Sequence, residues 1–574
     1  MVHFSSHIFI SMTTEKIRNF VYITLGLFVF LVVLLLSFKI LVHAETVTTT
    51  VTVGNSAPSF TAGPAESTAS DGTTPTNEGS NVVFQATATD SNAEDYYLAI
   101  CKTDAITAGV GGAAPTCAAS STWCVSTATD SGVQASCTYT TQGTDAESND
   151  WYAFVCDNNS SSASCSTPGD DGTGATGSPF KVNHDPSFSA VSDNGGGGAD
   201  SGANPGGTMT FTATASDGDS DTVQDTVKLV VCADTTGATA SGCAGTQICA
   251  STNTASNPSC QISIAAVAPD TTINYYAYVF DSHSFASVSN YRTGAYIINN
   301  LAPVVSSVTL NGAANISVPE GDTLNVPVTA TVQDKNSCQD LTTVETSLYR
   351  SAIAYSGCDT NAEDNDNYCY AQVSCSVVGG TCTGSTDEFA DYTCTVVVQY
   401  HADPTDANSQ YPAQNWLNTV NAIDDDAATH AVQVGAGVEV ATVSGLDVTS
   451  SINYGSLDVG QKNDPLDKIT AVTNTGNTGI DTDLSGTDMT DGGSGVIGVG
   501  YQKHALAAST AYASGSALST TATEYEINVL KTTISASPEI ENIWWGLEIP
   551  TGIPPGVYNG TNTVLAVLGE LIEW

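Results

Sequence analysis

The sequence predicts an all-β protein in which β-sandwich domains follow one another along the chain, and three observations support this. A segment of alternating apolar and polar residues that ends on an aspartate occurs three times, at intervals of roughly 120 residues, which suits a whole β-sandwich domain. Four cysteines recur in the same order in each interval. Ala, Ser, Thr and Gly are abundant and Lys is scarce, a composition that favours short strands and loops over long surface helices.

Each repeated unit begins with the pattern Asn-x-x-Pro, at Asn55, Asn183 and Asn300. Alternation over several residues is typical of a strand with one buried face. The expected strands are 82–90, 209–217 and 326–334, with a second strand-like run at 151–157, 275–281 and 416–424. We therefore expect three sandwich domains, at 55–182, 183–299 and 300–440, after a linker at 45–54.

Every unit contains four cysteines in the same order, and the second and third sets share two of their spacings. The sets are Cys101, Cys117, Cys124 and Cys137; Cys232, Cys243, Cys249 and Cys260; and Cys358, Cys369, Cys375 and Cys394. Cys156 with Cys165, and Cys338 with Cys382, are additional. No two cysteines are spaced Cys-x-x-Cys, which argues against a zinc ribbon or a thioredoxin-type site.

An even number of cysteines, 16, in an exported chain indicates disulfides. Four cysteines permit three connectivities, and the spacing does not decide among them. We favour first with second and third with fourth, because residues 122–124 and 135–137 resemble facing strands of a hairpin. The predicted bonds are Cys101–Cys117, Cys124–Cys137, Cys156–Cys165, Cys232–Cys243, Cys249–Cys260, Cys358–Cys369, Cys375–Cys394 and Cys338–Cys382.

Residues 1–44 have the features of an export signal. Lys16 and Arg18 precede an apolar run at 20–38, and Val42-His-Ala44 offers small residues where a signal peptidase cleaves. The run is also long enough to span a bilayer as a helix. We expect either secretion after cleavage near Ala44 or anchoring at the cell surface with the uncleaved helix in the membrane. The positive-inside rule places the rest of the chain outside the cell in both cases.

Residues 446–574 contain no cysteine and are expected to form a β-sandwich of a different type, with strands at 543–550 and 556–561. Trp544 and Trp545 are adjacent, so in a strand they face opposite sides. One is expected in the core, and the other is a candidate contact for carbohydrate or a partner subunit. Asn158, Asn315 and Asn559 fit the glycosylation sequon, which matters only if the source organism glycosylates.

The net charge of −46, from 13 basic and 59 acidic residues, excludes nucleic acid and anionic membranes as binding partners. It suits solubility, a salty medium or cation binding. The strongest site candidate is Asp217, Asp219 and Asp221, because alternate carboxylates at a strand end can converge on calcium, which requires six to eight oxygen ligands. The alternative is a solvated acidic loop. Weaker versions are Asp90 with Asp95 and Asp334 with Asp340.

Catalytic motifs are missing from the sequence: there is no Gly-x-Ser-x-Gly elbow, Walker loop or His-Glu-x-x-His helix. We therefore expect a protein without catalytic activity and without a required cofactor, apart from the possible calcium.

The Asn-x-x-Pro headings, the Glu78-Gly79 and Glu320-Gly321 pairs and the strand ends at Asp90, Asp217 and Asp334 resemble tandem immunoglobulin-like domains of prokaryotic cell-surface proteins, of the PKD and cadherin-like classes. The resemblance covers residues 55–440 and implies a stalk, spacer or adhesive array. Its partners would be other surface proteins, carbohydrate or a neighbouring cell. Two alternatives are a surface-layer or filament subunit assembling through its C-terminal domain, and a secreted carbohydrate- or peptide-acting enzyme with its site in 446–574.

The cysteine pairing is tested by mass mapping of proteolytic fragments from the unreduced protein. We expect a fragment that joins Cys101 to Cys117. A fragment that joins Cys101 to Cys137 would contradict the predicted connectivity.

Overall fold

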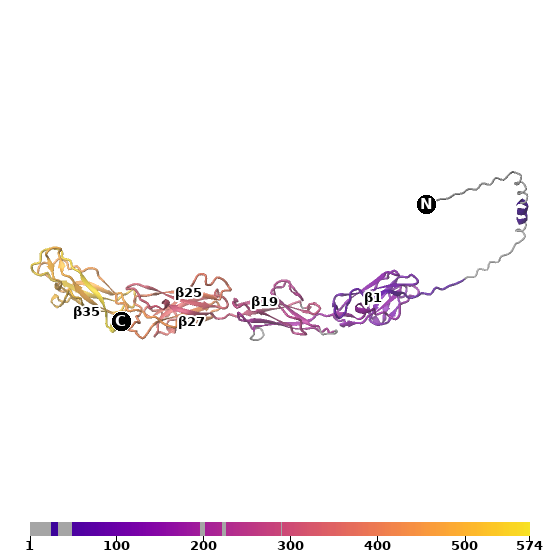
Figure 1. Ribbon diagram of the computed structural model, residues 1–574, viewed down its shortest axis with the longest axis horizontal. Coiled ribbons are helices and arrows are strands. Elements are labelled where there is room, and N and C mark those ends of the chain that lie inside the picture. Colours follow the sequence, from indigo (N-terminus) through magenta and orange to yellow (C-terminus); the bar gives the residue numbers. More distant parts are fainter. Residues whose placement is uncertain (1–23, 33–48, 196–200, 221–224, 289) are drawn as a thin grey trace, which may run out of the picture. The chain divides into compact units, whose positions relative to one another are not determined.

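The computed structural model describes residues 24–32, 49–195, 201–220, 225–288 and 290–574 (Figure 1). Its contacts divide the chain into two compact units. The first comprises the described residues up to Gly63, with Ala86–Ser136 and Ala153–Gly169, and the second comprises Pro64–Gln85, Cys137–Tyr152 and Asp170–Trp574. Residues 24–32 are helical, short 3-10 turns occur between strands, and the remaining regular structure is β, so the all-β prediction is confirmed.

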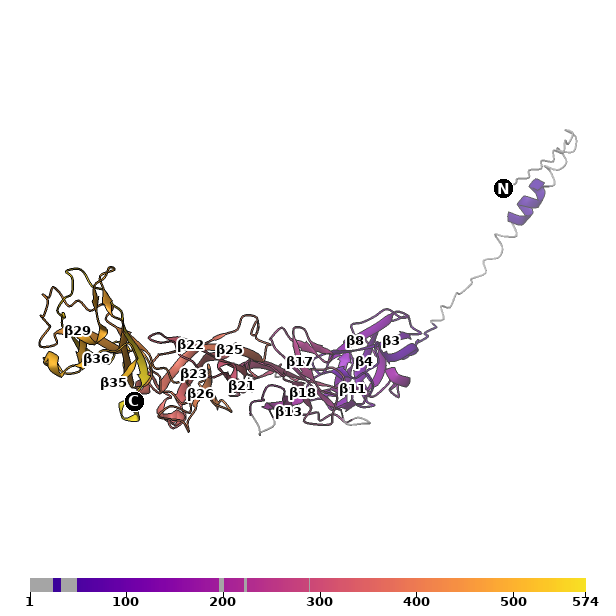
Figure 2. The same cartoon turned by 60° about the vertical axis from the view of Figure 1, so that its left-hand side comes forward.

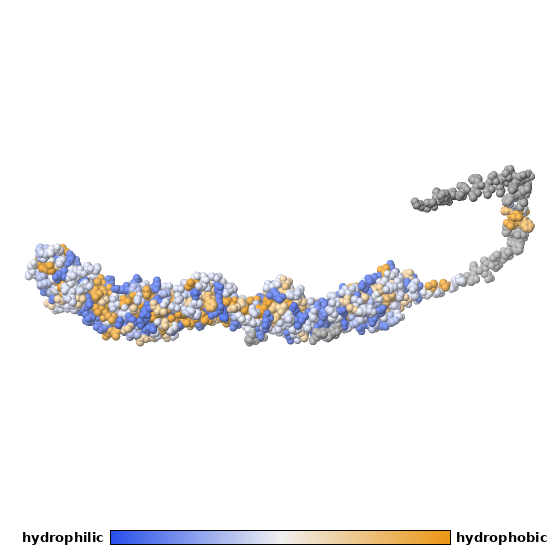
Figure 3. Space-filling model, viewed as in Figure 1, coloured by the Kyte–Doolittle hydropathy of each residue, from blue (hydrophilic) through white to orange (hydrophobic). Residues whose placement is uncertain are grey.

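The helix predicted at 20–38 is described over residues 24–32, which are helical, exposed and strongly apolar (Figure 3). The rest of that segment, and the expected cleavage position at Ala44, lie outside the described residues. Among the described residues, no helix combines the length and the apolar character that a membrane crossing requires.

The first expected domain contains three sheets, in the strand orders β1-β3-β8, β10-β4-β7 and β2-β11-β9. Their strands are β1 (Ser59–Glu66), β2 (Thr76–Asn77), β3 (Asn81–Thr89), β4 (Tyr96–Cys101), β7 (Thr122–Val125), β8 (Gln134–Thr140), β9 (Ser148–Asn149), β10 (Tyr152–Asp157) and β11 (Phe180–Asn183). Along β3 the apolar side chains alternate with polar ones, and Val82, Phe84, Ala86 and Ala88 are buried, as the period of two predicts.

Two sheets face each other in the second domain and enclose one core. The first has the order β12-β13-β18, from Ser187–Asn194, Thr208–Ser216 and Ser259–Ser263. The second has the order β17-β14-β19-β20, from Gln247–Ala250, Val227–Cys232, Thr271–Asp281 and Arg292–Ile298. Phe211 from the first sheet and Tyr275 from the second are fully buried in the core with their rings 4.9 Å apart. This is a β-sandwich.

The third domain is built on a seven-stranded sheet of order β21-β22-β25-β24-β23-β26-β27. The strands are β21 (Val304–Leu310), β22 (Leu324–Gln333), β23 (Leu341–Arg350), β24 (Cys369–Val377), β25 (Phe389–Val398), β26 (Trp416–Asp424) and β27 (Thr429–Gln433). Strand β21 also lies against β26 and β27 at the opposite end of this order, so the sheet folds over a core that includes Val328 and the fully buried Trp416.

Seven disulfides have printed partners: Cys101–Cys117, Cys156–Cys165, Cys232–Cys243, Cys249–Cys260, Cys338–Cys382, Cys358–Cys369 and Cys375–Cys394. Cys124 and Cys137 are disulfide-bonded as well. The hairpin argument behind the pairing was wrong, because β7 and β8 belong to different sheets. In the second domain Cys249 and Cys260 likewise lie on different sheets, so their bond crosses the core.

The C-terminal domain is also a sandwich, with sheets β28-β29-β36-β33-β34 and β35-β30-β37 (Figure 2). The strands are β28 (Leu446–Val448), β29 (Lys468–Asn474), β30 (Ile480–Gly486), β33 (Gln502–Ala505), β34 (Ser516–Ala517), β35 (Thr523–Val529), β36 (Ile540–Leu547) and β37 (Asn562–Leu568). The strand expected at 556–561 is wrong: this segment is a loop, and β37 begins after the turn at Asn559-Gly560.

The adjacent tryptophans provide a test of this sandwich. Trp545 is fully buried in its core, whereas Trp544 is half-buried on the other face of β36. Trp545→Ala should lower the free energy of unfolding of this domain by about 3–5 kcal/mol. Trp544→Ala, the matched control, should cost about 1 kcal/mol. Equal losses in chemical denaturation would contradict the assigned faces.

Candidate cation sites at the domain entries

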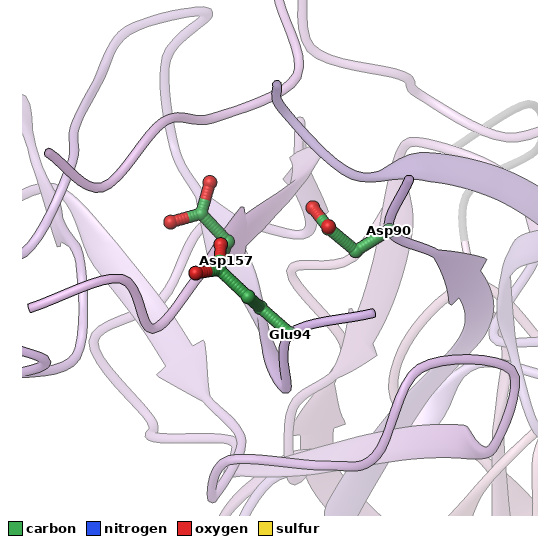
Figure 4. A group of neighbouring side chains, drawn as sticks. All are labelled: Asp90, Glu94 and Asp157. Atoms are coloured by element: carbon green, nitrogen blue, oxygen red, sulfur yellow. The ribbon is translucent and has the colours of Figure 1, made fainter. Parts of the chain in front are cut away.

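Three acidic side chains come together at one end of the first sandwich. Asp90 directly follows β3, Glu94 lies in the next loop and Asp157 ends β10. One oxygen of each lies within 4.8 Å of the other two, and Figure 4 shows these carboxylates on neighbouring segments. Asp90 and Asp157 are buried. Carboxylates held this close repel one another unless a proton or a cation lies between them.

The same positions form acidic groups in the next two sandwiches. In each, one aspartate follows the first long strand of the unit (β13 or β22), one lies in the following loop, and one ends the later strand (β19 or β26). The groups are Asp217, Asp225 and Asp281, and Asp334, Asp340 and Asp424, again with oxygens within 4.8 Å. The two strand ends meet because the strands that carry them belong to one sandwich and end at the same side.

The heading asparagine of each unit binds the far member of its group. The side-chain amide of Asn55 donates to Asp157 Oδ2 at 2.8 Å, that of Asn183 to Asp281 Oδ2 at 2.7 Å, and that of Asn300 to Asp424 Oδ2 at 3.1 Å. The bond joins the linker to the sandwich that follows it. An amide can do this while its own oxygen stays available as a ligand.

A second contact fixes the backbone after each heading residue. The amides of Ser56, His184 and Leu301 donate to the side chains of Asn92, Asp219 and Asn336, at 3.0, 2.6 and 2.7 Å. Each acceptor residue lies two positions after its strand-end aspartate. Its own N–H donates to Oδ1 of that aspartate, at 2.6, 2.9 and 2.8 Å. The Asp-x-Asn or Asp-x-Asp sequence therefore locks the linker.

Oxygen atoms remain unpartnered inside these groups. Oδ1 of all three heading asparagines is buried without a hydrogen-bond partner among the described residues. The same holds for Asp90 Oδ2 and Glu94 Oε2 in the first group and for Asp334 Oδ2 and Asp340 Oδ2 in the third. A buried polar oxygen without a partner is costly, so its recurrence at equivalent positions needs a ligand to explain it. Carbonyl and carboxylate oxygens are the donors that hard cations such as Ca²⁺ prefer.

The electrostatics of the second and third groups agree with this. Burial, with the charges of Asp281 and Asp225 among its neighbours, raises the pKa of Asp217 from 3.8 to about 6. Burial, with the charges of Asp424 and Asp270, raises the pKa of Asp334 to about 6 as well. Burial and a hydrogen bond with Asp425 raise the pKa of Asp340. Each shift measures how poorly the folded chain alone tolerates the ionised carboxylates.

A further acidic group adjoins the third site. Asp340 also lies within 4.8 Å of Asp270 and Asp425 through one oxygen of each. Asp270 precedes β19 in the second sandwich, while Asp340 and Asp425 belong to the third. Asn336 is fully buried beside them, and its side-chain amide donates to Ala268 O at 3.2 Å and Asn299 O at 3.0 Å. The third site is therefore continuous with a contact between consecutive sandwiches.

The predicted trio of Asp217, Asp219 and Asp221 is not brought together as expected. Asp217 joins Asp225 and Asp281, whereas the carboxylate of Asp219 binds His184 Nδ1 at 2.9 Å. The reason is that Asp219 is the linker lock of its unit rather than a member of the acidic group. Asp221 lies outside the described residues. Asp95 of the first unit is near Asn158, whose amide donates to it at 3.5 Å.

Sequence reasoning used the three headings as boundaries and missed that Asn55, Asn183 and Asn300 are site residues. Their recurrence in step with the strand-end aspartates was the available signal. Of the sequon residues, Asn315 and Asn559 are exposed and Asn158 is half-buried.

The C-terminal sandwich has a cavity of about 570 Å³ between its loops. Its lining includes Ile452, Tyr454, Asp458, Val557 and Tyr558, and Asp458 is the acidic residue among the described lining residues. A hydrolytic carboxylate dyad needs two acids. The enzyme hypothesis therefore gains no support from this cavity.

No protein-family model and no curated protein matches the chain. Three solved structures resemble it at low scores. A marsupial T cell receptor is 12% identical, covers 63% of this chain and 98% of its own, and has a TM-score of 0.24. A tetra-tandem repeat from the extending region of a large adhesion protein is 12% identical, with coverages of 85% and 96% and a TM-score of 0.28. Protocadherin gamma B2 cadherin domains 3–6 are 10% identical, with coverages of 88% and 99% and a TM-score of 0.26. Scores this low support no conclusion about what the chain binds or does.

The raised pKa values predict how stability responds to pH. Asp217 and Asp334 keep their protons up to about pH 6 in the folded chain, against an ordinary value of 3.8. The folded state then binds more protons than the unfolded state, so in chelator the free energy of unfolding should fall as pH rises from about 4 to about 6. With excess calcium the fall should be reduced or reversed, since the cation takes the place of the protons. Identical slopes in urea denaturation with chelator and with calcium would contradict cation binding.

Proposed function

We propose that this chain is a non-enzymatic extracellular protein whose tandem sandwiches form a structural or adhesive array stabilised by calcium. The cations would bind at the three entry sites, each formed by the heading asparagine and three acidic residues. The disulfides fit an oxidising location outside the cell. By the resemblance of the domains to immunoglobulin-like repeats, the partners would be other surface proteins, carbohydrate or a neighbouring cell.

The observation that carries the proposal is the repetition of one arrangement in three sandwiches. In each, the amide nitrogen of the heading asparagine is used by the far aspartate, while its buried oxygen faces no partner among the described residues. A solvated acidic loop explains neither the burial of these oxygens nor their equivalence. A cation would satisfy them and offset the repulsion among the carboxylates, and it would make the linker-to-sandwich contacts calcium-dependent.

The test is thermal unfolding of the full chain in chelator and in about 1 mM calcium, a range typical of extracellular modules. We expect calcium to raise the melting temperature by several degrees. Asp334→Asn removes a charge from the third site and should abolish the part of the shift that belongs to that sandwich. Asp322→Asn changes an exposed aspartate of the same sandwich outside the site and should keep the full shift.

An unchanged melting temperature of the wild-type chain in calcium would refute the calcium array. A calcium response that Asp334→Asn leaves intact would show that the cation binds elsewhere.

A further inference from the structure

The C-terminal sandwich carries another acidic group, in a different place from the entry sites. Asp481 lies on the central strand β30, Glu526 on its neighbour β35, and Glu570 follows β37, which flanks β30 on the other side. One oxygen of each lies within 4.8 Å of the others. Ile480 and Leu484 point into the core, so Asp481 is on the opposite face of the sheet.

An irregularity in the pairing of β30 with β35 holds Asp481 in place. The register shifts between Ile480 and Thr482, and Asn528 adopts a left-handed conformation with φ of 59°. The backbone N–H of Asn528 donates to Asp481 Oδ1 at 2.9 Å. Asp481 is only 1% exposed, which is unusual for a carboxylate without a basic partner.

Glu573 supplies the second, independent observation. It lies in the turn η8 (Leu571–Glu573), is 4% exposed, and neither of its carboxylate oxygens has a hydrogen-bond partner among the described residues. Burial, followed by the charges of Asp481 and Glu570, raises its pKa to about 6. Its side chain packs over Gly479 and Gly569, where a Cβ atom on either glycine would collide with it. A buried carboxylate beside three others needs a counter-charge.

Among the described lysines and arginines, none forms an ion pair with these four carboxylates. Lys531 is close, and its backbone N–H donates to Glu573 O at 2.8 Å. Its ammonium group is directed elsewhere, to Asp403 Oδ1 at 2.5 Å and Asn367 Oδ1 at 3.2 Å in the third sandwich. The counter-charge is therefore expected from outside the chain.

We propose that Asp481, Glu526, Glu570 and Glu573 form a fourth cation site, selective for a hard divalent ion such as calcium. It goes beyond the proposed function, because it lacks the heading asparagine, lies on a sheet face and belongs to the domain without cysteines. The ion would hold the turn η8 against β30 and β35. Since Glu573 bonds the backbone of Lys531, the site also supports the residue that joins this sandwich to Asp403.

Terbium(III), a luminescent substitute for calcium, tests the site in the full chain. Trp574 follows Glu573, and its indole N–H donates to Gly569 O at 3.1 Å, so it is placed to sensitise an ion held by these carboxylates. We expect tryptophan-excited terbium emission that excess calcium displaces. Trp574→Phe should remove this emission component, and Glu570→Gln should weaken its terbium affinity about tenfold, since one charged ligand is lost.

Glu524→Gln is the matched control, because Glu524 is an exposed glutamate two residues before Glu526 on the same strand. It should leave the emission unchanged, as should Asp334→Asn in the third entry site. Calorimetry should also show that the Asp481→Asn/Glu570→Gln double variant binds one calcium fewer than the Glu524→Gln variant. Emission that survives Trp574→Phe, with equal calcium stoichiometry in the double variant and the control, would overturn the fourth site whether or not the entry sites bind calcium.

Discussion

The contact on which the arrangement of the repeats depends is the hydrogen bond from a heading asparagine to the aspartate at the end of a later strand. Asn55, Asn183 and Asn300 each make it, over more than a hundred residues when Asn55 binds Asp157 or Asn300 binds Asp424. The bond closes a linker onto its own sandwich. It also leaves one amide oxygen facing a group of carboxylates, so the contact that orders the linker is the same one that creates a cation ligand.

Two kinds of cross-link then act at different levels. The disulfides restrict each cysteine-containing domain, and in the second sandwich Cys249–Cys260 joins the two sheets across the core. The acidic groups lie where each domain begins, at the point that disulfides do not reach. A chain with a net charge of −46 has little basic material for neutralising these groups. Divalent cations from the medium are the complementary charge, and this links stability to calcium and pH rather than to redox conditions.

The recurring strands and cysteines were readable because they are periodic in sequence: alternation marks one buried face, and the strand ends fall on Asp90, Asp217 and Asp334. The geometry of the bonds was less accessible. Residues 122–124 and 135–137 resembled a hairpin, but hairpin neighbours and strands of opposing sheets have the same local pattern, and packing alone distinguishes them. In the same way Asp219 resembled a ligand, although its carboxylate is used by the linker and His184.

The sequence by itself determined the β class, the repeated units, the cysteine content and the excess of acid, because these follow from local periodicity and composition. The tertiary structure decided which carboxylates meet. Asp90 is brought to Asp157, and Asp481 to Glu526 and Glu570, by strands distant in sequence that become neighbours only when the sheets form. Which of the many acidic residues form a site is therefore a consequence of strand order and register, quantities that no short stretch of sequence encodes.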